Sequence, residues 1–258
     1  MIVKIMDDIM NKKVEKIKKI NKVVVKSFNL ENNESIVKED FVCIEEKYNI
    51  YFNGEYITNT IATPNNIKEL AVGYMVSEGI KYITADLIKS IDIEGNIIYI
   101  EANVCNTNNK YTKNSNDNEN NGKNINLKLN TIKKIIKYME NITGVWKITG
   151  GAHWACISDL GGNILINIED IGRHNAVDKV IGHCILNNID LTNKILISSG
   201  RQPTLMVKKA LNAKIPAIIS KSPPTDKGVK IARENNIILI GFARKNKFIA
   251  YSEWDRII

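Results

Sequence analysis

KILISSGRQPTLMVKKALNAKIPAIISKSPPTDKGVKIARENNIILIGF (residues 194–242) contains three short apolar runs separated by two longer amphipathic segments. The amphipathic segments begin near Pro203 and Thr225, and both residue types favour the start of a helix. Apolar runs of this length are typical of buried strands, so the predicted order is strand, helix, strand, helix, strand. Buried strands joined by helices form parallel sheets. We therefore predict an α/β fold with a largely parallel sheet.

The sequence before this stretch adds further elements. Four apolar residues at helical spacing predict a helix: Ile132, Ile135, Ile136 and Met139. A strand is predicted at 145–148, and a hairpin is expected to pair 155–158 with 164–168. A second helix is expected over 175–186. Together with the alternating stretch, these elements predict a C-terminal α/β domain over 125–258.

The first half of the chain is expected to begin with strands joined by turns, over residues 21–62. Asn53-Gly54, flanked by aromatic and β-branched residues, is a strong hairpin signal. A further strand is predicted near 96–104 and leads to Cys105. Residues 21–105 therefore predict an N-terminal α+β domain.

A helix is expected within this domain. Thr63 is suited to cap it, and Pro64 to occupy its first position. Five apolar residues then repeat at the spacing of one buried face: Ile67, Leu70, Ala71, Tyr74 and Met75. Gly79 is placed to end the helix in a left-handed turn.

Two polar segments flank the N-terminal domain. Residues 1–26 contain eight lysines against three acidic residues, which accounts for much of the formal net charge of +8. We expect residues 1–20 to form a basic, solvated extension, although a short amphipathic helix also fits the pattern. Residues 106–124 contain nine asparagines and only one sizeable apolar residue, so we expect a mobile linker between the two domains.

The composition excludes several classes of function. With 7% aromatic residues and no basic stripe outside the N-terminal arm, the chain offers no platform for nucleic acid. No apolar run approaches the roughly 20 residues that span a bilayer, and we expect a cytoplasmic protein. The cysteines form no C-x-x-C pair, so neither disulfides nor a zinc site is expected. Three of them lie in apolar runs and are expected in the core: Cys43, Cys156 and Cys184.

Four polar clusters fall where predicted strands end or helices begin. They are Thr149 to His153, Glu169 to Asn175, Ser198 to Arg201 and Ser220 to Thr225. Glycines let a ligand approach the backbone, helix N-termini offer N–H groups, and arginines grip phosphate. Because ligands bind beyond the carboxyl ends of parallel strands, we predict a nucleotide phosphate site at these residues: Gly172, Arg173, His174, Gly200 and Arg201. His153 and His174 are equally suited to structural hydrogen bonds.

Five blocks of sequence point to one known family. They are TPNNIKELAVGYMVSEGI (63–80), TGGAHWA (149–155), EDIGRHNAVDKVIG (169–182), SGR followed by MVKKA (within 198–210) and LIGFARKNKFIAY (239–251). In this combination the chain resembles the formate dehydrogenase accessory sulfurtransferase family, FdhD/NarQ. The resemblance implies an N-terminal roll similar to β-grasp domains and a C-terminal domain similar to cytidine deaminases. It also implies a homodimer.

The same resemblance implies a function. Members of the family take sulfur from a cysteine desulfurase as a cysteine persulfide. They pass it to molybdenum in the bis(molybdopterin guanine dinucleotide) cofactor, which formate dehydrogenase requires. The resemblance implies that Cys105 is the catalytic sulfur carrier and that the cofactor is cargo, with guanosine diphosphate as a fragment ligand. The cofactor-binding residues it implies are Phe242, Ala243, Arg244, Lys245, Asn246 and Lys247.

The sequence departs from the family pattern in three places. Asn108 stands where the family has the second cysteine of a C-x-x-C, Leu205 replaces a glutamate, and Ser222-Pro223-Pro224-Thr225 replaces Ser-Ala-Pro-Thr. Cys105 is then either an exposed persulfide carrier or a small apolar residue that ends a strand. A cofactor-binding chaperone that carries no sulfur is the alternative function. A zinc deaminase is disfavoured because the chain lacks H-x-E and P-C-x-x-C.

Overall fold

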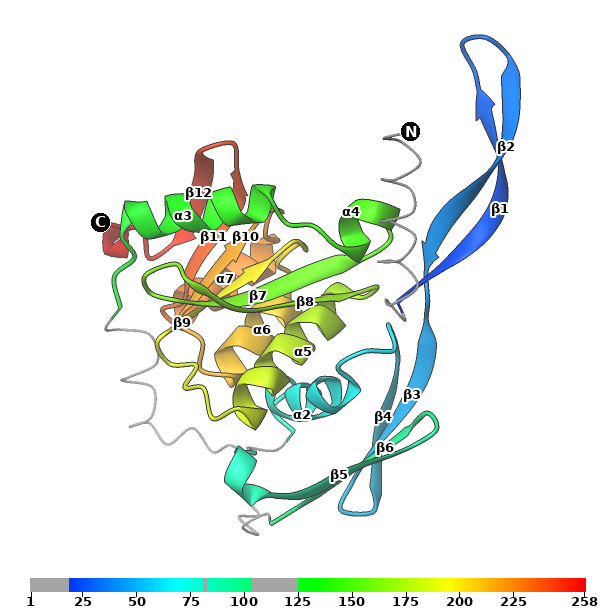
Figure 1. Cartoon of the computed structure of the whole chain (residues 1–258). Coiled ribbons are helices and arrows are strands. Elements are labelled where there is room, and N and C mark those ends of the chain that lie inside the picture. The colour runs from blue at the N-terminus through cyan, green and yellow to red at the C-terminus, as the bar shows by residue number, and fades with distance from the viewer. Residues whose placement is uncertain (1–18, 81–82, 104–124) are drawn as a thin grey trace.

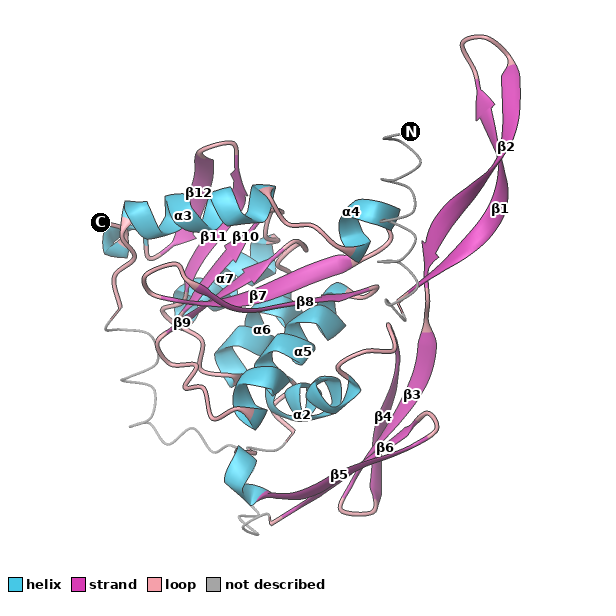
Figure 2. Ribbon diagram, viewed as in Figure 1, coloured by secondary structure: helices cyan, strands magenta, loops and turns pink. Residues whose placement is uncertain are grey.

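The computed structural model describes residues 19–80, 83–103 and 125–258 (Figure 1). Within these ranges the chain forms a six-stranded, a four-stranded and a two-stranded sheet together with helices (Figure 2). The predicted α/β class is confirmed. The predicted linker 106–124, Cys105 and residues 1–18 of the predicted extension lie outside the described residues.

The six-stranded sheet is the centre of the molecule. In the spatial order β12-β11-β10-β9-β7-β8, its strands are β12 (Lys247–Ser252), β11 (Ile238–Arg244), β10 (Ala217–Ser220), β9 (Lys194–Ser198), β7 (His153–Asp159) and β8 (Ile164–Asp170). Strands β9, β10 and β11 are parallel, as predicted. The prediction of a largely parallel sheet is wrong, because the hairpin of β7 and β8 and the returning strand β12 pair antiparallel.

Helices cover both faces of this sheet. One face carries α3 (Leu129–Glu140), and the other carries α5 (Arg173–Leu186), α6 (Thr204–Asn212) and α7 (Asp226–Glu234); α2 (Ile67–Ser77) packs on α5 and α6. Alternate residues of β9 serve the two faces: Ile195 and Ile197 pack in the core beneath α3, whereas Leu196 packs in the core of α2 and α5. Figure 1 shows α3 above the sheet and α5 and α6 below it. The predicted helices over 132–139 and 175–186 are confirmed.

The strand predicted at 145–148 is wrong, because these residues form the short helix α4 (Val145–Thr149). The carboxylate of Glu169 accepts hydrogen bonds from the N–H groups of Val145 and Trp146, at 2.9 and 2.8 Å. These bonds satisfy N–H groups that the start of a helix leaves unpaired. Gly150 adopts a left-handed conformation and ends the helix after one turn.

Helix α2 begins at Ile67, later than predicted. Thr63 and Pro64 lie before the helix. The hydroxyl of Thr63 accepts a hydrogen bond from the N–H of Ile171 at 3.2 Å, and the N–H of Thr63 donates to the carboxylate of Asp170 at 3.1 Å. The predicted cap is therefore wrong, since Thr63 makes a long-range contact instead. Gly79, with φ of 69°, follows the end of the helix in a left-handed conformation, as predicted.

The N-terminal half contains the four-stranded sheet β4-β3-β6-β5. Its strands are β3 (Glu46–Phe52), β4 (Glu55–Ala62), β5 (Ile88–Glu94) and β6 (Ile97–Ala102). The hairpin at Asn53-Gly54 is confirmed, and both residues have positive φ. Strand β5 was not predicted. The likeness of this half to a β-grasp roll stays a prediction, as does the likeness of the second half to cytidine deaminases.

Two long strands project from the body of the protein as a ribbon. Strands β1 (Ile20–Asn29) and β2 (Glu34–Cys43) pair antiparallel along their whole length. Figure 1 shows this β1–β2 ribbon reaching away from both larger sheets. Its base packs on α4 through Phe41 and Cys43.

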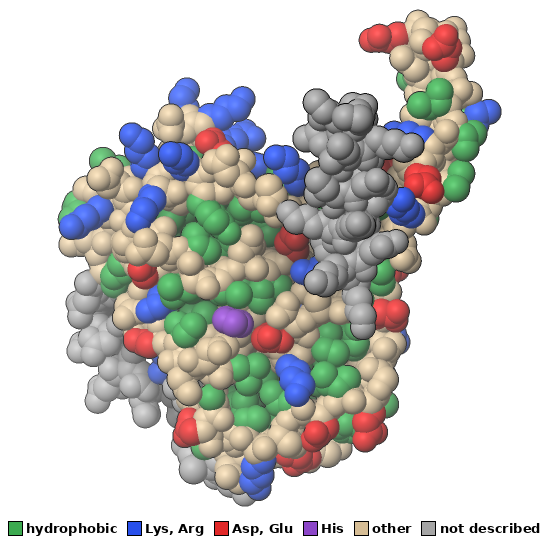
Figure 3. Space-filling view, in the orientation of Figure 1, with side chains coloured by type: hydrophobic (Ala, Val, Ile, Leu, Met, Phe, Trp, Pro, Cys, Tyr) green, Lys and Arg blue, Asp and Glu red, His purple; other side chains and the backbone are tan. Residues whose placement is uncertain are grey.

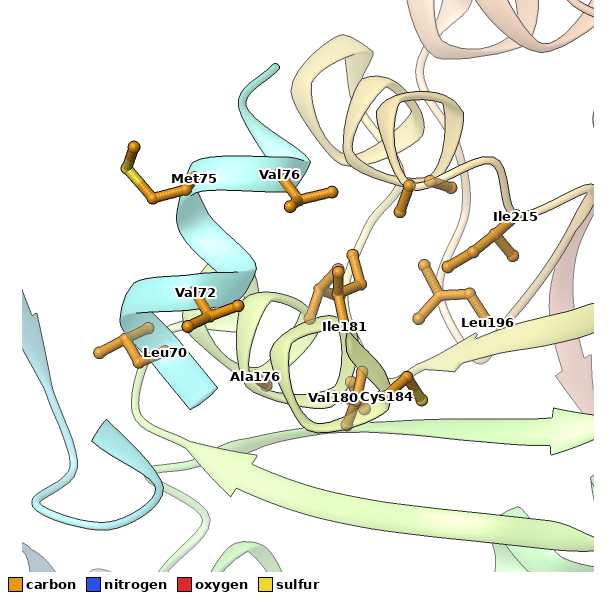
Figure 4. Packing of buried hydrophobic residues seen from close by; sticks show 14 of the residues in the cluster. Leu70, Val72, Met75, Val76, Ala176, Val180, Ile181, Cys184, Leu196 and Ile215 are labelled. Atoms are coloured by element: carbon orange, nitrogen blue, oxygen red, sulfur yellow. The ribbon is translucent and has the colours of Figure 1, made fainter. Parts of the chain in front are cut away.

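Helices α2 and α5 cross in direct backbone contact. A Cβ added to Gly73 would lie 1.8 Å from the carbonyl oxygen of Asp178, and one added to Gly182 would lie 1.9 Å from that of Glu69. The side chains around this crossing form a single core (Figure 4): Leu70, Val72, Met75, Val76, Ala176, Val180, Ile181 and Cys184. This core joins residues of the two halves of the chain, one before and one after residues 104–124.

Candidate functional site

The carboxyl ends of β8, β9, β10 and β11 lie at one edge of the six-stranded sheet. Strands β9 to β11 are parallel, and β8 runs in the same direction because β7 is antiparallel to both β8 and β9. His153, at the start of β7, reaches the same edge. The four polar clusters of the sequence are thus brought to a common edge, which we call the carboxyl edge.

Asp170 fixes the turn between β8 and α5. It is fully buried, and its Oδ1 accepts hydrogen bonds from Gly172 N at 2.8 Å and from Asn175 Nδ2 at 3.0 Å. Its Oδ2 accepts from Lys179 Nζ at 2.6 Å and from the N–H of Thr63. Burial lowers the pKa of Lys179, and the negative charge of Asp170 acts in the opposite direction and raises it. The ion pair therefore holds the start of α5 in place and links it to the N-terminal half.

A second buried ion pair joins α2, α5 and α6. Lys209 Nζ lies 2.8 Å from the carboxylate of Asp178 and also donates to Ser77 Oγ, at 3.1 Å, and to Glu78. Burial would lower the pKa of Lys209, but Asp178 and Glu78 together raise it. The lysine therefore stays protonated, and its charge acts on the nearby start of α5.

Helix α5 presents polar atoms without partners at the carboxyl edge. Gly172, Arg173 and His174 begin it with no side-chain cap and no acidic residue in the first turn. Arg173 Nε and His174 Nε2 are buried and lack a hydrogen-bond partner within the described ranges. Gly200 packs so closely that an added Cβ would lie 2.8 Å from that of Arg173, and Arg201 next to it is exposed. Donors and the positive end of a helix dipole suit an anion.

The two histidines of the carboxyl edge are held neutral. Burial, followed by the charge of Arg173, lowers the pKa of His174 to about 4. The same two causes lower the pKa of His153, whose Nδ1 lies 3.1 Å from Ser199 Oγ. An anion bound beside Arg173 would offset its charge and raise both pKa values.

The stability of the protein should depend on pH through His174. The unfolded chain binds a proton at this residue near pH 6.5, whereas the folded chain resists it until about pH 4. Because the unfolded state binds more protons between these values, the free energy of unfolding should fall as the pH falls from 6.5 towards 4. His174→Gln should flatten this part of the profile in urea unfolding. Parallel profiles for the parent and the variant would contradict the assignment.

The residues 242–247 form the end of β11 and its turn into β12. Phe242 has φ of 51°, which is rare for a bulky residue, at an irregularity in the pairing of the two strands. The guanidinium of Arg244 lies over the Phe242 ring at 5.7 Å. Lys245 N donates to Glu140 Oε1 at 2.6 Å, which ties the turn to the end of α3. Ala243 is buried and faces the core.

This hairpin is cationic. It lines a shallow pocket of about 560 Å³ with Phe242, Arg244, Lys245, Asn246, Lys247, Phe248 and Ile249. Figure 3 shows lysine and arginine side chains gathered at the top of the molecule, around the β11–β12 turn and the neighbouring helix α3. The structure therefore places the predicted site residues in two groups, one at the start of α5 with Gly200 and Arg201 and one on this hairpin.

The described cysteines differ in burial. Cys156 and Cys184 are core residues, as expected, and burial raises the pKa of both thiols, that of Cys184 to about 12. The expectation for Cys43 is wrong, because this residue ends β2 at the base of the ribbon and is only half-buried; its Sγ lies 3.2 Å from Thr149 Oγ1. A buried thiol of raised pKa is a poor nucleophile. The predicted carrier, Cys105, lies outside the described residues.

Some contributors to the carboxyl edge were missed as individual residues. Asp170 is one of these residues. The sequence feature that could have identified it is an acidic residue at the end of an apolar strand, two positions before a glycine. Lys221 is another, with Nζ 4.5 Å from the centre of the Trp146 ring. Gln202 is fully buried, and its Oε1 has no partner within the described ranges. Nothing in the sequence marks Gln202 as buried.

Among residues 19–80, 83–103 and 125–258, no group of three histidine, cysteine, aspartate or glutamate side chains is placed to hold a metal ion. Over the same ranges, no helix is long and apolar enough to cross a membrane.

The fold and the carboxyl edge define an α/β protein with a mixed central sheet and a cationic, donor-rich strand edge. Residues 43–258 match the FdhD/NarQ family, and the chain belongs to that family. The resemblance read from the five sequence blocks is confirmed.

Individual relatives agree with this assignment. Protein FdhD of Methanocaldococcus jannaschii is 48% identical over 237 residues, which cover 90% of this chain and 96% of that protein. Sulfur carrier protein FdhD of Sulfurisphaera tokodaii is 34% identical over 262 residues, covering 91% and 98%. The crystal structure of a putative formate dehydrogenase accessory protein from Desulfotalea psychrophila has a TM-score of 0.78 at 24% identity, covering 93% of this chain and all of that one. The structural likeness shows the fold.

Proposed function

We propose that this protein is a sulfur carrier that serves formate dehydrogenase. The observation that carries the proposal is the similarity, over about nine-tenths of the chain, to a protein named sulfur carrier protein FdhD. The description of the similar crystal structure as a putative formate dehydrogenase accessory protein agrees with the proposal. In this function a cysteine desulfurase is the sulfur donor, formate dehydrogenase is the beneficiary, the protein is a homodimer, and the site of action is the cytoplasm.

The finer chemistry of the proposal is persulfide transfer. The thiolate of Cys105 attacks the terminal sulfur of the desulfurase persulfide, the old S–S bond breaks, and the desulfurase thiolate leaves. In the second transfer the S–S bond of the new persulfide would break, Cys105 would leave as a thiolate, and the outer sulfur would pass to molybdenum in the bis(molybdopterin guanine dinucleotide) cofactor, whose metal would supply the two electrons that reduce it to sulfide. The cofactor is cargo rather than a resident group. The inert buried thiols Cys156 and Cys184 support the choice of Cys105.

The cargo fits the two groups of site residues. A guanine dinucleotide carries phosphates, and the start of α5 offers buried donors without partners beside Gly200. Arg201 and the cations of the 242–247 hairpin add charge for further phosphate oxygens. We propose that these groups hold the cofactor and its fragment guanosine diphosphate.

Guanosine diphosphate binding should weaken when either group loses an arginine. One lost charge-assisted contact costs roughly 1.5 to 3 kcal/mol, or about ten- to a hundredfold in affinity. Calorimetry should therefore show this loss for Arg201→Ala and for Arg244→Ala. Lys230→Ala, an exposed cation on α7, is the control and should bind like the parent. Parent-like binding by both arginine variants would remove the site assignment.

A cofactor chaperone that carries no sulfur is the second candidate. Asn108 in place of the second cysteine of the family pattern favours it. Mass spectrometry after incubation with a cysteine desulfurase and cysteine separates the two functions. A mass increase of one sulfur atom on the peptide that contains Cys105 supports the carrier, and its absence supports the chaperone.

A further inference from the structure

The β1–β2 ribbon exposes apolar side chains along its length. Val24, Phe28, Ile36 and Val37 are 74%, 66%, 61% and 70% exposed. Within the described ranges no third strand pairs with either β1 or β2. A two-stranded ribbon alone is marginally stable in water, and an apolar surface of this kind marks an interaction site.

Within the described part of the chain, the base of the ribbon packs on the body of the protein through one of its two faces. Ile20, Phe41 and Cys43 alternate to the same face and pack with α4. Among the residues that the structure describes, no strand pairs with the outer edge of β2, opposite β1, and an unpaired edge is a template for another strand. Residues 43–258 match the family, so β1 and nearly all of β2 precede the matched segment. The similar crystal structure covers 93% of this chain, so it includes at least part of the ribbon.

We propose that the outer edge of β2 pairs antiparallel with β2 of a second copy of this chain, with Glu39 at the centre. The two ribbons then form one four-stranded sheet. This specifies the contact of the homodimer included in the proposed function, and it is independent of sulfur transfer and cofactor binding.

The sequence of β2 is complementary to itself in this register. A two-fold axis perpendicular to the sheet keeps the same face of both strands on the same side. Residues that lie opposite each other then have their side chains on one face, so their numbers are either both odd or both even. With Glu39 opposite its own copy, Lys38 lies opposite Asp40 of the second copy. Val37 then lies opposite Phe41, and Ile36 opposite Val42. The symmetry makes each of these favourable pairs twice.

The neighbouring registers of β2 lack this match. Centring the pair on Lys38 places two lysines together and Ile36 against Asp40, and centring it on Asp40 places two aspartates together. In the favoured register, the central Glu39 carboxylates face each other, but each is 3.0 Å from Lys22 Nζ of its own chain. The charge at the centre is therefore compensated locally.

The outer edge of β1 is not complementary to itself. Centring it on Val24 sets Lys22 against Lys26, and centring it on Val25 sets Lys22 against Phe28. Like charges directly opposite each other are destabilising. Charge and apolar pattern together therefore select the β2 edge and a second copy as its occupant.

Charge reversal at positions 38 and 40 tests the pairing. Sedimentation velocity over a range of concentrations should show that the full-length parent is a dimer. Lys38→Asp and Asp40→Lys each turn two attractive pairs into two repulsive ones, so each variant should dimerise roughly ten- to a hundredfold more weakly. Lys26→Asp reverses a charge on β1, which does not take part in the proposed β2–β2 contact, and should leave the dimer unchanged.

Mixing the two variants gives the decisive result. In a mixed pair, the aspartates of the Lys38→Asp chain face the lysines of the Asp40→Lys chain, so the mixture should regain the affinity of the parent. This recovery also proves that both variants are folded. A monomeric parent, parent-like dimers of both single variants, or a mixture as weak as its components would each overturn the proposal.

Discussion

Replacing Lys179 with methionine is expected to lower the free energy of unfolding by about 3 to 5 kcal/mol. The Lys179 and Asp170 side chains are both fully buried and lie 2.6 Å apart. Removal of the lysine leaves a buried carboxylate without its counter-charge, which costs far more than the pair itself contributes. Urea unfolding followed by circular dichroism measures the change.

The matched control for this variant is Lys230→Met. Lys230 and Glu234 lie one helical turn apart on α7, at 3.8 Å, and both side chains are largely exposed. Such a pair contributes about 0 to 1 kcal/mol, so the control should unfold nearly like the parent. Equal losses for Lys179→Met and Lys230→Met would show that burial of the Asp170 pair has no energetic weight.

Replacing Cys105 with serine is expected to abolish both protein-bound sulfane sulfur and activation of formate dehydrogenase. The thiolate is the nucleophile that accepts sulfur, and a serine hydroxyl stays protonated at neutral pH. Because Asn108 provides no second thiol, the persulfide of the parent cannot resolve to a local disulfide and should persist until an outside thiol attacks it. Mass spectrometry and complementation of cells that lack the native protein give the two readouts.

Cys43→Ser is the control for the Cys105 variant. Cys43 is half-buried and is held near Thr149, so it tests whether another accessible thiol takes part. We expect Cys43→Ser to retain activation and Cys105→Ser to retain guanosine diphosphate binding. Full activation by Cys105→Ser would assign the chain to the chaperone function.

The elements that local sequence determines were predictable. The strands and helices of 194–242 alternate as expected because each apolar run is bounded by its own turn or capping residues. The Asn53-Gly54 hairpin needed only its two turn residues. Helix α4 was missed because a carboxylate from another strand, Glu169, caps it, and no local pattern reports such a contact.

The mixture of parallel and antiparallel pairing in the six-stranded sheet could not be predicted from local sequence either. The position of β7 between β8 and β9 depends on pairing between Ala155 and Ser198, which lie far apart in the chain. At the site, the strand-end polar clusters were recognisable because glycine and arginine follow apolar runs. Burial of Lys179 was not, since a lysine on an amphipathic helix ordinarily reaches solvent.

The crossing of α2 and α5 bears on how the chain is made. Gly73 leaves the ribosome about a hundred residues before Gly182, an interval of about 5 to 20 s at typical rates of synthesis. During that interval the apolar face of α2 lacks the helix against which it packs. The first half of the chain is therefore synthesised before the helix on which α2 packs, and until α5 emerges the apolar face of α2 stays exposed, which is the kind of surface that makes folding intermediates prone to aggregate.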